Sequence, residues 1–504
     1  MTTTFSDETL SGAGRRSFAA SFAQQHSWFL DQLEPGSALT TFSATVQVNQ
    51  SLSVEVLERS LDLLVQRHGT LRTTFAMREG QLIQLITAHS LVTLAARDLR
   101  GLSEAEQQAQ IRSLSSTQAQ LPFALEQGPL LRCTLVLLGE ERSQLLLNLH
   151  SAICDAWSVG VLVHDLASLY EACSQGKPSP LPPLPVQYAQ LAKEQQEGMA
   201  RGIFAEDIVY WKQQLAQAPE TQELPTDRPQ PAVASWRGAS YEVVLPGELN
   251  QSLQEVSRQQ QVSQNIVLAT AYAALLSRYS DQEDLLIGNE VPARSRAGTE
   301  SLIGPFENLQ PLHVDLSGNP SFAQLFERMR QTMQEAQTHE DLPFELLLKE
   351  VPNSRTLGRN LLVRAMLRLP LTQPPLPDGW RLTHLEEGTG TAQFDLTLEL
   401  QDSVQGLLAR FIYRTDLFEK STIARLAGHW QTLLESIVAD IRQPLAHVSL
   451  LTVQERFQLL EEWTATEKPY PQHALAQLFE AQVARRPEAI AVICEEEQIS
   501  YQEL

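Results

Sequence analysis

The stretch LNLHSAICDAWSVGVLVHDL, residues 147–166, holds side chains of the types that carry out acid–base and acyl-transfer chemistry. His150 could act as a base, Ser151 carries a hydroxyl and Asp155 a carboxylate, between an apolar run and a helical pattern. An imidazole exchanges protons near neutral pH, whereas a serine hydroxyl reacts only when an adjacent base activates it. No such partner of Ser151 is marked in the neighbouring sequence.

The period of a strand decides whether His150 and Ser151 can act together. QLLLNLH (144–150) has the length and composition of a strand, and neighbouring side chains of a strand point to opposite faces. We therefore expect His150 to be a hydrogen-bonded histidine buried beside the sheet, which cannot stand in for its neighbour. Ser151 then either fills space or hydrogen-bonds an attacking amine or an ordered water.

Alternating strand and helix patterns position this stretch. Ser53 followed by apolar residues at helical spacing, with Gly69 beyond them, predicts a capped amphipathic helix. Further helices are predicted at about 157–173, 186–198, 204–217, 247–261, 264–280, 320–338 and 419–440. Strands are predicted at 71–77, 81–87, 130–138, 144–150, 240–246, 284–291, 309–315, 361–369, 394–401 and 407–415. This is an α/β plan in two lobes, divided at the five prolines of KPSPLPPLPVQ (177–187).

Composition narrows the class of protein. With 504 residues, 43% of them hydrophobic, the chain can bury two or three cores. The 60 acidic and 38 basic residues give a net charge of −22 without basic runs, which argues against nucleic acid as a partner. No segment approaches the roughly 18 apolar residues of a membrane span, and the N-terminus lacks a signal peptide's apolar core. We expect a monomeric, cytoplasmic protein without a metal site, whose thiols are reduced: Cys133, Cys154, Cys173 and Cys494.

A series of short motifs runs along the chain in a fixed order. The segments are SFAQQHSWFLDQLEPGS (21–37), RHGTLRTTF (67–75), NLHSAICDAWS (148–158), PVQYAQLA (185–192), IGPFENLQPL (303–312), HEDLPFELL (339–347) and RTLGRNLLV (355–363). In order and spacing they resemble the condensation domains of nonribosomal peptide synthetases, which are related to chloramphenicol acetyltransferase. The resemblance covers residues 17 to about 455, although His26 and Ser27 stand where Arg and Leu are usual.

The resemblance implies two chloramphenicol-acetyltransferase-like lobes in a V-shaped pseudo-dimer with a tunnel between them. It implies an acyltransferase that forms an amide, in which the amine of an aminoacyl thioester attacks the carbonyl of an acyl or peptidyl thioester. Both reactants would arrive on 4′-phosphopantetheine arms, one from an upstream donor carrier protein and one from a downstream acceptor carrier protein. The domain would hold no covalently bound cofactor of its own. Orientation of two tethered reactants would supply much of the catalysis.

The central motif of this family is HHxxxDGxS, and the chain departs from it. The family's first His is largely structural, its second is the proposed base or positioning group, and its Asp is structural through an ion pair. These positions are His150, Ser151 and Asp155 in this chain, and Ala156 replaces the Gly. Loss of a general base typically costs about 10²–10⁴ in rate, so Ser151 is expected to slow the reaction or abolish it. The resemblance nominates Arg294 as the partner that a buried Asp155 needs.

Other motif residues have expected structural or substrate-contacting roles. Trp157 and Ser158 open the helix after the motif, as packing and capping groups. With Ala156 and Asn308 they are also our candidates for contact with substrate, although Pro305 and Glu307 depart from the motif around Asn308. Structural roles are expected for seven more, with Asp341 as a helix cap: His68, Arg72, His164, His339, Asp341, Pro343 and Phe344.

The ends of the chain suggest a domain plan. We expect a flexible tail over 1–16, lobes over 17–180 and 181–455, a linker over 456–473, and the start of an adenylation domain over 474–504, where ISYQEL (499–504) resembles that family's first core motif. No phosphate-binding loop or LGGxS-like carrier motif is present, so the chain itself is not expected to activate an amino acid. With no carrier before Met1, the donor is expected from another polypeptide or as a starter acyl group.

Three interpretations of Ser151 stay open from the sequence. The first is a working condensation domain in a peptide or hybrid polyketide/peptide line, in which placement of the reactants suffices. The second is a catalytically silent platform that docks or gates carrier proteins or a tailoring enzyme. The third is an engineered replacement of the His. Ala156 favours natural divergence, because inactivation of the site would not require it.

Overall fold

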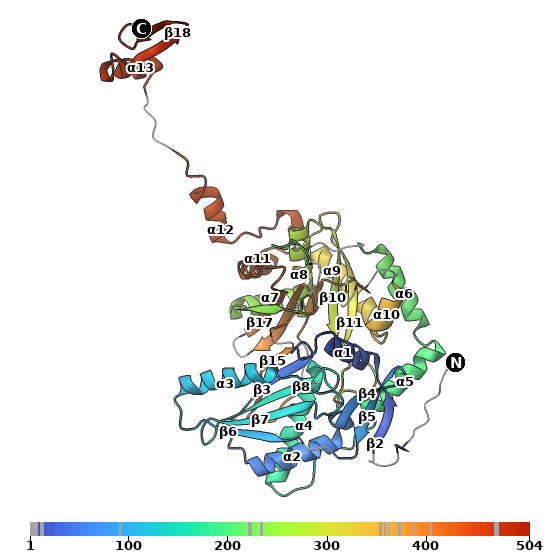
Figure 1. Cartoon of the computed structure of the whole chain (residues 1–504). Coiled ribbons are helices and arrows are strands. Elements are labelled where there is room, and N and C mark those ends of the chain that lie inside the picture. The colour runs from blue at the N-terminus through green and yellow to red at the C-terminus, as the bar shows by residue number, and fades with distance from the viewer. Residues whose placement is uncertain are drawn as a thin grey trace. The chain divides into compact units, whose positions relative to one another are not determined.

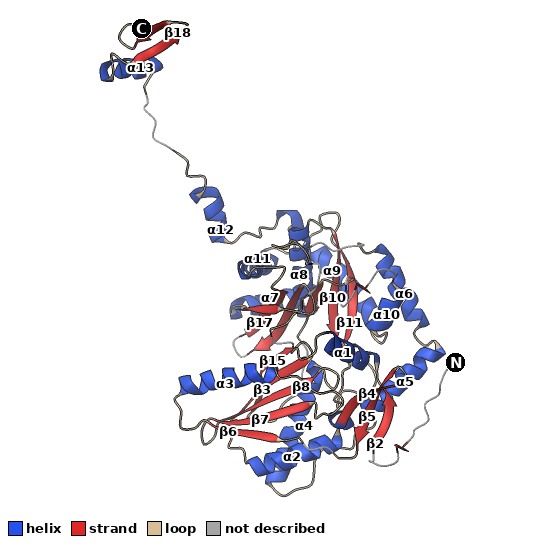
Figure 2. Cartoon of the chain, in the orientation of Figure 1, coloured by secondary structure: helices blue, strands red, loops and turns tan. Residues whose placement is uncertain are grey.

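The structure is a computed structural model of the chain (Figure 1). It describes residues 9–10, 15–89, 92–219, 224–231, 235–351, 355–356, 359–360, 362–370, 374–387, 390–403, 406–467 and 473–504. Contacts within the chain define two compact units, Met1–Leu450 and Leu451–Leu504. Alternation of strands and helices along the larger unit confirms the predicted α/β class (Figure 2).

The first lobe of the larger unit is built on two sheets. One has the strand order β15-β3-β8-β7-β6, in which β15 (Trp380–Glu387) comes from late in the chain, and the other has the order β1-β2-β5-β4. Helices α2 and α4 bury apolar residues at helical spacing in the core of this lobe, among them Leu57, Leu61, Leu162 and Leu166. Its elements are β1 (Thr9–Leu10), β2 (Arg15–Ala19), α1 (Phe22–Leu33), β3 (Thr41–Val48), α2 (Val54–Arg67), η1 (Gly69–Arg72), β4 (Thr73–Arg78), β5 (Gln81–Thr87), β6 (Leu94–Asp98), α3 (Glu104–Ala119), β7 (Leu131–Leu137), β8 (Ser143–His150) and α4 (Ala156–Ser174).

The second lobe surrounds a mixed sheet of strand order β11-β10-β14-β16-β17-β9. Its core contains the fully buried Tyr272, Phe322 and Trp430. The helices after the proline-rich crossover are α5 (Tyr188–Arg201) and α6 (Ala205–Gln217). The remaining elements are β9 (Gly238–Val244), α7 (Gly247–Gln260), α8 (Gln264–Ser280), β10 (Asp284–Val291), β11 (Asn308–Asp315), α9 (Phe322–Gln337), α10 (Phe344–Glu350), β12 (Arg355–Thr356), β13 (Arg359–Asn360), β14 (Ala365–Arg368), β15 (Trp380–Glu387), β16 (Leu396–Ser403), β17 (Gly406–Arg414), α11 (Lys420–Ala439) and η2 (Leu445–His447).

Strand β15 lies late in the sequence but belongs to the sheet of the first lobe. It pairs antiparallel with β3, with Trp380 opposite Val48. The Trp380 side chain is buried in the first lobe's core. No strand was predicted over these residues. The structure therefore reveals that β15 leaves the second lobe and joins the sheet of the first. It joins the two lobes by backbone hydrogen bonds.

The chain ends differ in detail from the expected plan. Strand β1 pairs with β2, and β2 starts at Arg15 and pairs with β5, so the structure places strand residues within the predicted tail over 1–16. In the smaller unit, α12 (Val453–Phe457) and η3 (Gln458–Glu462) make the start of the predicted linker helical, and its residues 468–472 lie outside the described residues. The unit ends with α13 (Leu475–Arg485), β18 (Ile490–Cys494) and β19 (Glu497–Ser500).

Three chemical features of the described residues complete the description. No helix there is both long and apolar enough to cross a membrane. The four cysteines, all of which lie among the described residues, form no disulfide there. Within the same residues, no group of three or more His, Cys, Asp or Glu side chains is arranged to hold a metal ion.

Candidate functional site

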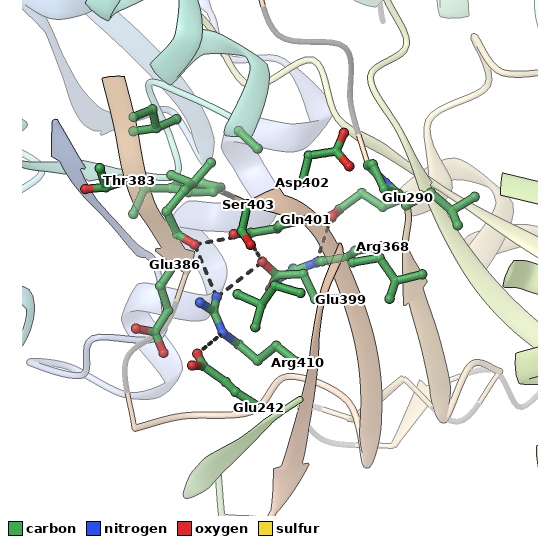
Figure 3. A pocket seen from close by; sticks show the side chains of 18 of the residues that line it. Glu242, Glu290, Arg368, Thr383, Glu386, Glu399, Gln401, Asp402, Ser403 and Arg410 are labelled. Atoms are coloured by element: carbon green, nitrogen blue, oxygen red, sulfur yellow. Dashed lines mark hydrogen bonds and ion pairs between the residues drawn. The ribbon is translucent and has the colours of Figure 1, made fainter. Parts of the chain in front are cut away.

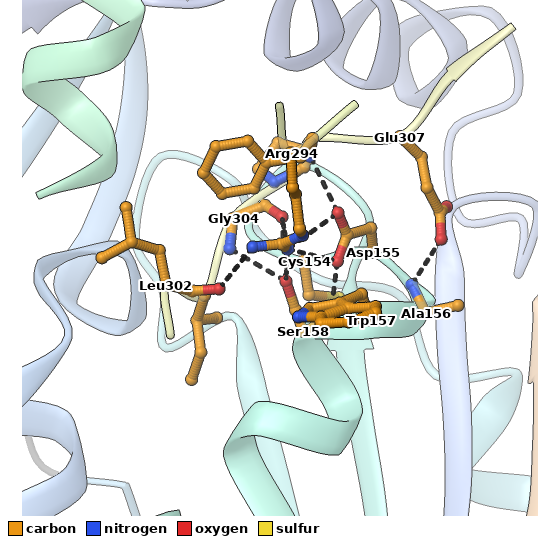
Figure 4. A network of polar contacts seen from close by, with 12 residues as sticks. Cys154, Asp155, Ala156, Trp157, Ser158, Arg294, Leu302, Gly304 and Glu307 are labelled. Atoms are coloured by element: carbon orange, nitrogen blue, oxygen red, sulfur yellow. Dashed lines mark hydrogen bonds and ion pairs between the residues drawn. The ribbon is translucent and has the colours of Figure 1, made fainter. Parts of the chain in front are cut away.

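The motif loop, residues 150–156, connects the end of β8 to the start of α4 (Figure 4). Asp155 is the N-cap of α4 and accepts a hydrogen bond from the Ser158 backbone N at 2.7 Å. Ser158 was predicted as the capping group, and that prediction is wrong, because the carboxylate three residues earlier takes the position. The other functional side chains of the site are placed around this cap.

Asp155 and Arg294 form a buried ion pair between the lobes. The Arg294 Nη2 donates to both carboxylate oxygens of Asp155, at 2.9 and 3.0 Å, and the Phe306 backbone N donates to Oδ2 at 2.9 Å. With the bond from Ser158, the carboxylate accepts about as many bonds as it can. The sequence-based expectation that these two residues lie together agrees with this geometry.

Arg294 also organises the bridging loop, residues 294–307, which leads into β11. Its Nη1 donates to the carbonyls of Thr299 and Leu302, at 2.6 and 2.9 Å. The guanidinium carbon lies 4.0 Å from the centre of the Phe306 ring, which adds a cation–π contact. One side chain thus folds the loop and fastens it to the start of α4.

Trp157 and Ser158 attach α4 to the same bridging loop. The Trp157 Nε1 donates to the Glu300 carbonyl at 2.9 Å. The Ser158 hydroxyl donates to the Gly304 carbonyl at 2.9 Å and accepts from the Gly304 backbone N at 3.0 Å. A Cβ at Gly304 would lie 2.2 Å from the buried Tyr188 ring, so only glycine fits there. Trp157 and Ser158 therefore both lie at the junction of the lobes.

His150 is enclosed by the first lobe. Its Nδ1 accepts from the Ala152 backbone N at 3.0 Å, so the proton sits on Nε2, which lies 2.9 Å from the Thr40 hydroxyl and 3.6 Å from the Asp31 carboxylate. The side chain is 1% exposed. Burial lowers the pKa of His150 from its ordinary 6.5, and Asp31 opposes this shift in part. The ring is therefore a neutral, structural group, as the strand pattern predicts.

Ser151 lies in the turn directly after β8. Its backbone N donates to the Thr40 carbonyl at 2.8 Å, and the residue is buried. The described residues place no histidine or carboxylate in a hydrogen bond with its hydroxyl. Ser151 therefore lacks the activating base that a nucleophilic or proton-accepting serine requires.

A cavity of about 760 Å³ lies between the lobes (Figure 3). Phe42 and Ala156 line it from the first lobe, and the rest of the wall is formed by β15, by strands of the second lobe and by loop residues that include Glu307. The position of Ala156 in this wall fits its predicted contact with substrate. A second cavity of about 120 Å³ adjoins the bridging loop and is lined by Asn308 and by the loop before α10.

Asn308 holds the start of α10. Its Nδ2 donates to the carbonyls of Glu340 and Leu342, at 2.8 and 2.7 Å, and its Oδ1 accepts from the Phe344 backbone N at 3.0 Å. The side chain amide is therefore committed to positioning this helix. Asp341 was predicted to cap this helix, and that prediction is wrong. It accepts from the Ser295 hydroxyl at 2.8 Å, and Pro343 is the N-cap.

The other motif residues expected to be structural have polar partners. His68 Nε2 and Arg67 Nε both contact the Asp165 carboxylate at 2.9 Å. Arg72 donates to backbone carbonyls, including that of Val65 at 2.9 Å. His164 contacts the Pro375 carbonyl at 2.8 Å, and His339 contacts Asp207 at 2.6 Å.

A ladder of alternating charges on the floor of the large cavity was missed by the sequence analysis. Glu242, Arg410, Glu399 and Arg368 lie directly opposite one another on four neighbouring strands, and Arg368 contacts Glu290 at 2.7 Å. Arg410 lies 2.8 Å from Glu242 and 3.3 Å from Glu399. Burial raises the pKa of Glu399, and Arg410 and Arg368 oppose this. Each residue looks isolated in its own strand, so only the register between strands reveals the ladder.

Comparisons with known proteins agree with this architecture. The family model described as "Condensation domain" matches residues 15–460. Linear gramicidin synthase subunits C and B from Brevibacillus parabrevis are 39% and 40% identical to the chain over 96% of its length. The chain spans only 6% and 10% of these relatives' own lengths. The X-domain from teicoplanin biosynthesis, solved in complex with OxyB, is 26% identical with a TM-score of 0.73, covering 89% of this chain and 98% of that one.

The chain thus belongs to the condensation-domain family of nonribosomal peptide synthetases, with the paired chloramphenicol-acetyltransferase-like lobes of that family. Condensation domains of these synthetases are acyltransferases that form amide bonds.

Two buried histidines predict how stability depends on pH. Burial lowers the pKa of His68 as it does that of His150, so both rings stay neutral while the unfolded chain takes up protons below 6.5. The unfolded state then binds more protons, and the free energy of unfolding is expected to fall by up to about 1.4 kcal/mol per pH unit per ring as the pH drops below this value. Denaturant titrations at about pH 7.5 and 5.5 measure the change.

A matched pair of variants isolates the contribution of one ring. His150→Gln is expected to lose less stability than the wild type over this pH interval, whereas His447→Gln, at an exposed position, should follow the wild type. Identical pH dependence of the two variants would contradict the buried neutral state of His150.

Proposed function

We propose that this chain joins an upstream acyl or peptidyl carrier thioester to an aminoacyl carrier thioester, in a nonribosomal peptide or hybrid polyketide/peptide line. The junction of the lobes carries the proposal. There a buried ion pair fixes the motif loop to the bridging loop, beside a cavity lined from both lobes. A fixed passage between two lobes suits a reaction whose rate depends on the alignment of two tethered reactants.

We further propose that both reactants enter on 4′-phosphopantetheine arms of separate carrier proteins. The domain then needs no cofactor of its own, since the thioesters already activate the acyl groups. Residues 474–504 would begin the adenylation domain that serves the acceptor carrier. Among the site residues, Asp155 and Arg294 join the lobes, His150 is buried in the first lobe, and Ala156 and Asn308 line the cavities.

A reconstituted assay tests the proposal. The donor and acceptor carriers are loaded with thioesters, and amide formation is followed by mass spectrometry for the wild type, Ser151→His and Ser151→Ala. We expect the wild type to form product above the uncatalysed background, because alignment supplies much of the rate. Ser151→His adds an imidazole and is expected to be faster by at most about 10²–10⁴-fold.

Ser151→Ala is the control for the serine hydroxyl and is expected to match the wild type. If neither the wild type nor Ser151→His forms amide while both still bind the carriers, the catalytic proposal is wrong.

A second candidate function is a catalytically silent docking platform. Two observations favour it: Ser151 has no activating base, and the X-domain of similar fold was solved as a complex with another protein, OxyB. In the same assay, carrier binding without product in any variant would support this alternative.

A further inference from the structure

Glu307 borders both of the cavities that lie between the lobes. It is the last residue of the bridging loop, is half-buried, and lines both the 760 Å³ cavity and the 120 Å³ cavity. Its Oε1 accepts a hydrogen bond from the Ala156 backbone N at 2.8 Å (Figure 4). A carboxylate from the second lobe thus contacts the motif loop of the first lobe within the passage.

The motif's own side chains do not supply a proton acceptor there. The His150 ring is enclosed in the first lobe, and Asp155 is 1% exposed with its oxygens already engaged by Arg294 and two backbone N–H groups. The Ser151 hydroxyl is neutral and cannot take a proton as an imidazole does. Glu307 accepts from the Ala156 backbone N and also lines both cavities.

We propose that Glu307 binds the ammonium group of the aminoacyl thioester and accepts its proton when the amide forms. This inference rests on the proposed function. A carboxylate can accept about four hydrogen bonds, so it can hold the Ala156 amide and an ammonium at the same time. A charge-assisted bond to the carboxylate would place the amine beside Glu307, in the wall that both cavities share.

The chemical step balances with these groups. The bound ammonium first gives one proton through Glu307 to solvent, and the neutral amine nitrogen then attacks the donor carbonyl carbon while the carbon–sulfur bond of the donor thioester breaks. The electron pair of that bond leaves with sulfur as the thiolate of the donor's pantetheine arm. The nitrogen that is now bonded to the donor carbonyl carbon gives its surplus proton to Glu307. Glu307 passes this proton to the thiolate, which leaves as the thiol. The carboxylate is regenerated, and no oxidant or further reactant is required.

Binding of two matched probes tests the ammonium contact directly. Glycyl-aminopantetheine, with a stable amide in place of the thioester, differs from acetyl-aminopantetheine only by its amine. The wild type is expected to bind the glycyl probe about tenfold more tightly, a difference of about 1.4 kcal/mol, because only this probe can donate a charge-assisted hydrogen bond from an ammonium to Glu307. Calorimetry or ligand-observed NMR measures both affinities without any turnover.

Glu307→Gln keeps the size of the side chain and an oxygen that can accept from Ala156 but removes the charge. It is expected to bind both probes equally. The control is Glu340→Gln, which removes a half-buried carboxylate from the wall of the smaller cavity and should keep the tenfold preference. A wild type that binds the two probes equally, or a Glu307→Gln variant that keeps the preference, would overturn the ammonium contact.

The rate of amide formation tests the proton transfer. Glu307→Gln is expected to lower it by about 10²-fold or more, and Ser151→His introduced into Glu307→Gln is expected to restore it, because the imidazole supplies the missing base. An unchanged rate in Glu307→Gln would overturn the proton transfer and leave the proposed condensation intact. An ammonium preference that depends on Glu307, in a protein that forms no amide with either residue at 151, would support the ammonium contact and refute the proposed condensation.

Discussion

Replacing Asp155 with alanine is expected to lower the free energy of unfolding by about 3–5 kcal/mol and to abolish amide formation. The Arg294 side chain is 4% exposed and faces both oxygens of this carboxylate. Without it the guanidinium remains buried with no counter-charge, and the Ser158 and Phe306 amides lose their acceptor. Denaturant unfolding, followed by circular dichroism, gives the change in stability.

An exposed pair on the same bridging loop provides the control. Arg296 contacts Glu194 at the surface, and Arg296→Ala is expected to cost less than about 1 kcal/mol because solvent screens such pairs. A loss below about 1 kcal/mol for Asp155→Ala would show that the buried pair does not hold the lobes together. The double change Asp155→Leu with Arg294→Met is expected to recover much of the stability, since apolar groups can replace a buried pair.

Replacing Arg410 with alanine is expected to be about as costly, roughly 3–5 kcal/mol near pH 8. Arg410 belongs to the charge ladder, and its side chain is 2% exposed and lies between Glu242 and Glu399. Its removal leaves the buried Glu399 with Arg368 as its remaining cationic neighbour in the ladder. Arg381→Ala, which removes an exposed arginine from the wall of the same cavity, serves as the control and should cost within about 0.5 kcal/mol.

The pH dependence of the Arg410→Ala effect identifies its cause. Burial raises the pKa of Glu399 in the folded protein, and loss of Arg410 raises it further. As the pH falls, the folded variant therefore takes up a proton at Glu399 before the unfolded chain does, and the difference in stability from the wild type shrinks. Unfolding titrations at about pH 8 and 5.5 measure this difference, and a difference independent of pH would refute the explanation.

The local elements of this fold could be predicted because their signals are contained in short segments. Ser53 and the apolar spacing after it specified α2, and the segment 284–291 matches β10 residue for residue. The pair Asp155 and Arg294 was nominated from family resemblance, not from the residues alone. The two are 139 positions apart, a separation that propensity and periodicity do not report.

The features that were missed all depend on contacts between distant segments. β15 was not predicted because its role at the edge of the first lobe's sheet shows only when β3 is beside it. Glu307 stood out in the sequence only as a departure from a motif, and its hydrogen bond to Ala156 spans 151 positions. Asp341 lies before a proline-containing turn, where a helix cap is common. Its carboxylate instead accepts a hydrogen bond from the Ser295 hydroxyl of the bridging loop.

A chimera that took its first lobe from one synthetase and its second lobe from another would carry a mismatch at β15. Trp380 would enter a foreign core, and β3 would pair with a foreign strand. A fragment ending within the prolines at 177–187 would instead leave β3 as an open edge, which favours aggregation. Recombination that moves residues 374–387 together with the first lobe would keep this sheet and its core from a single parent.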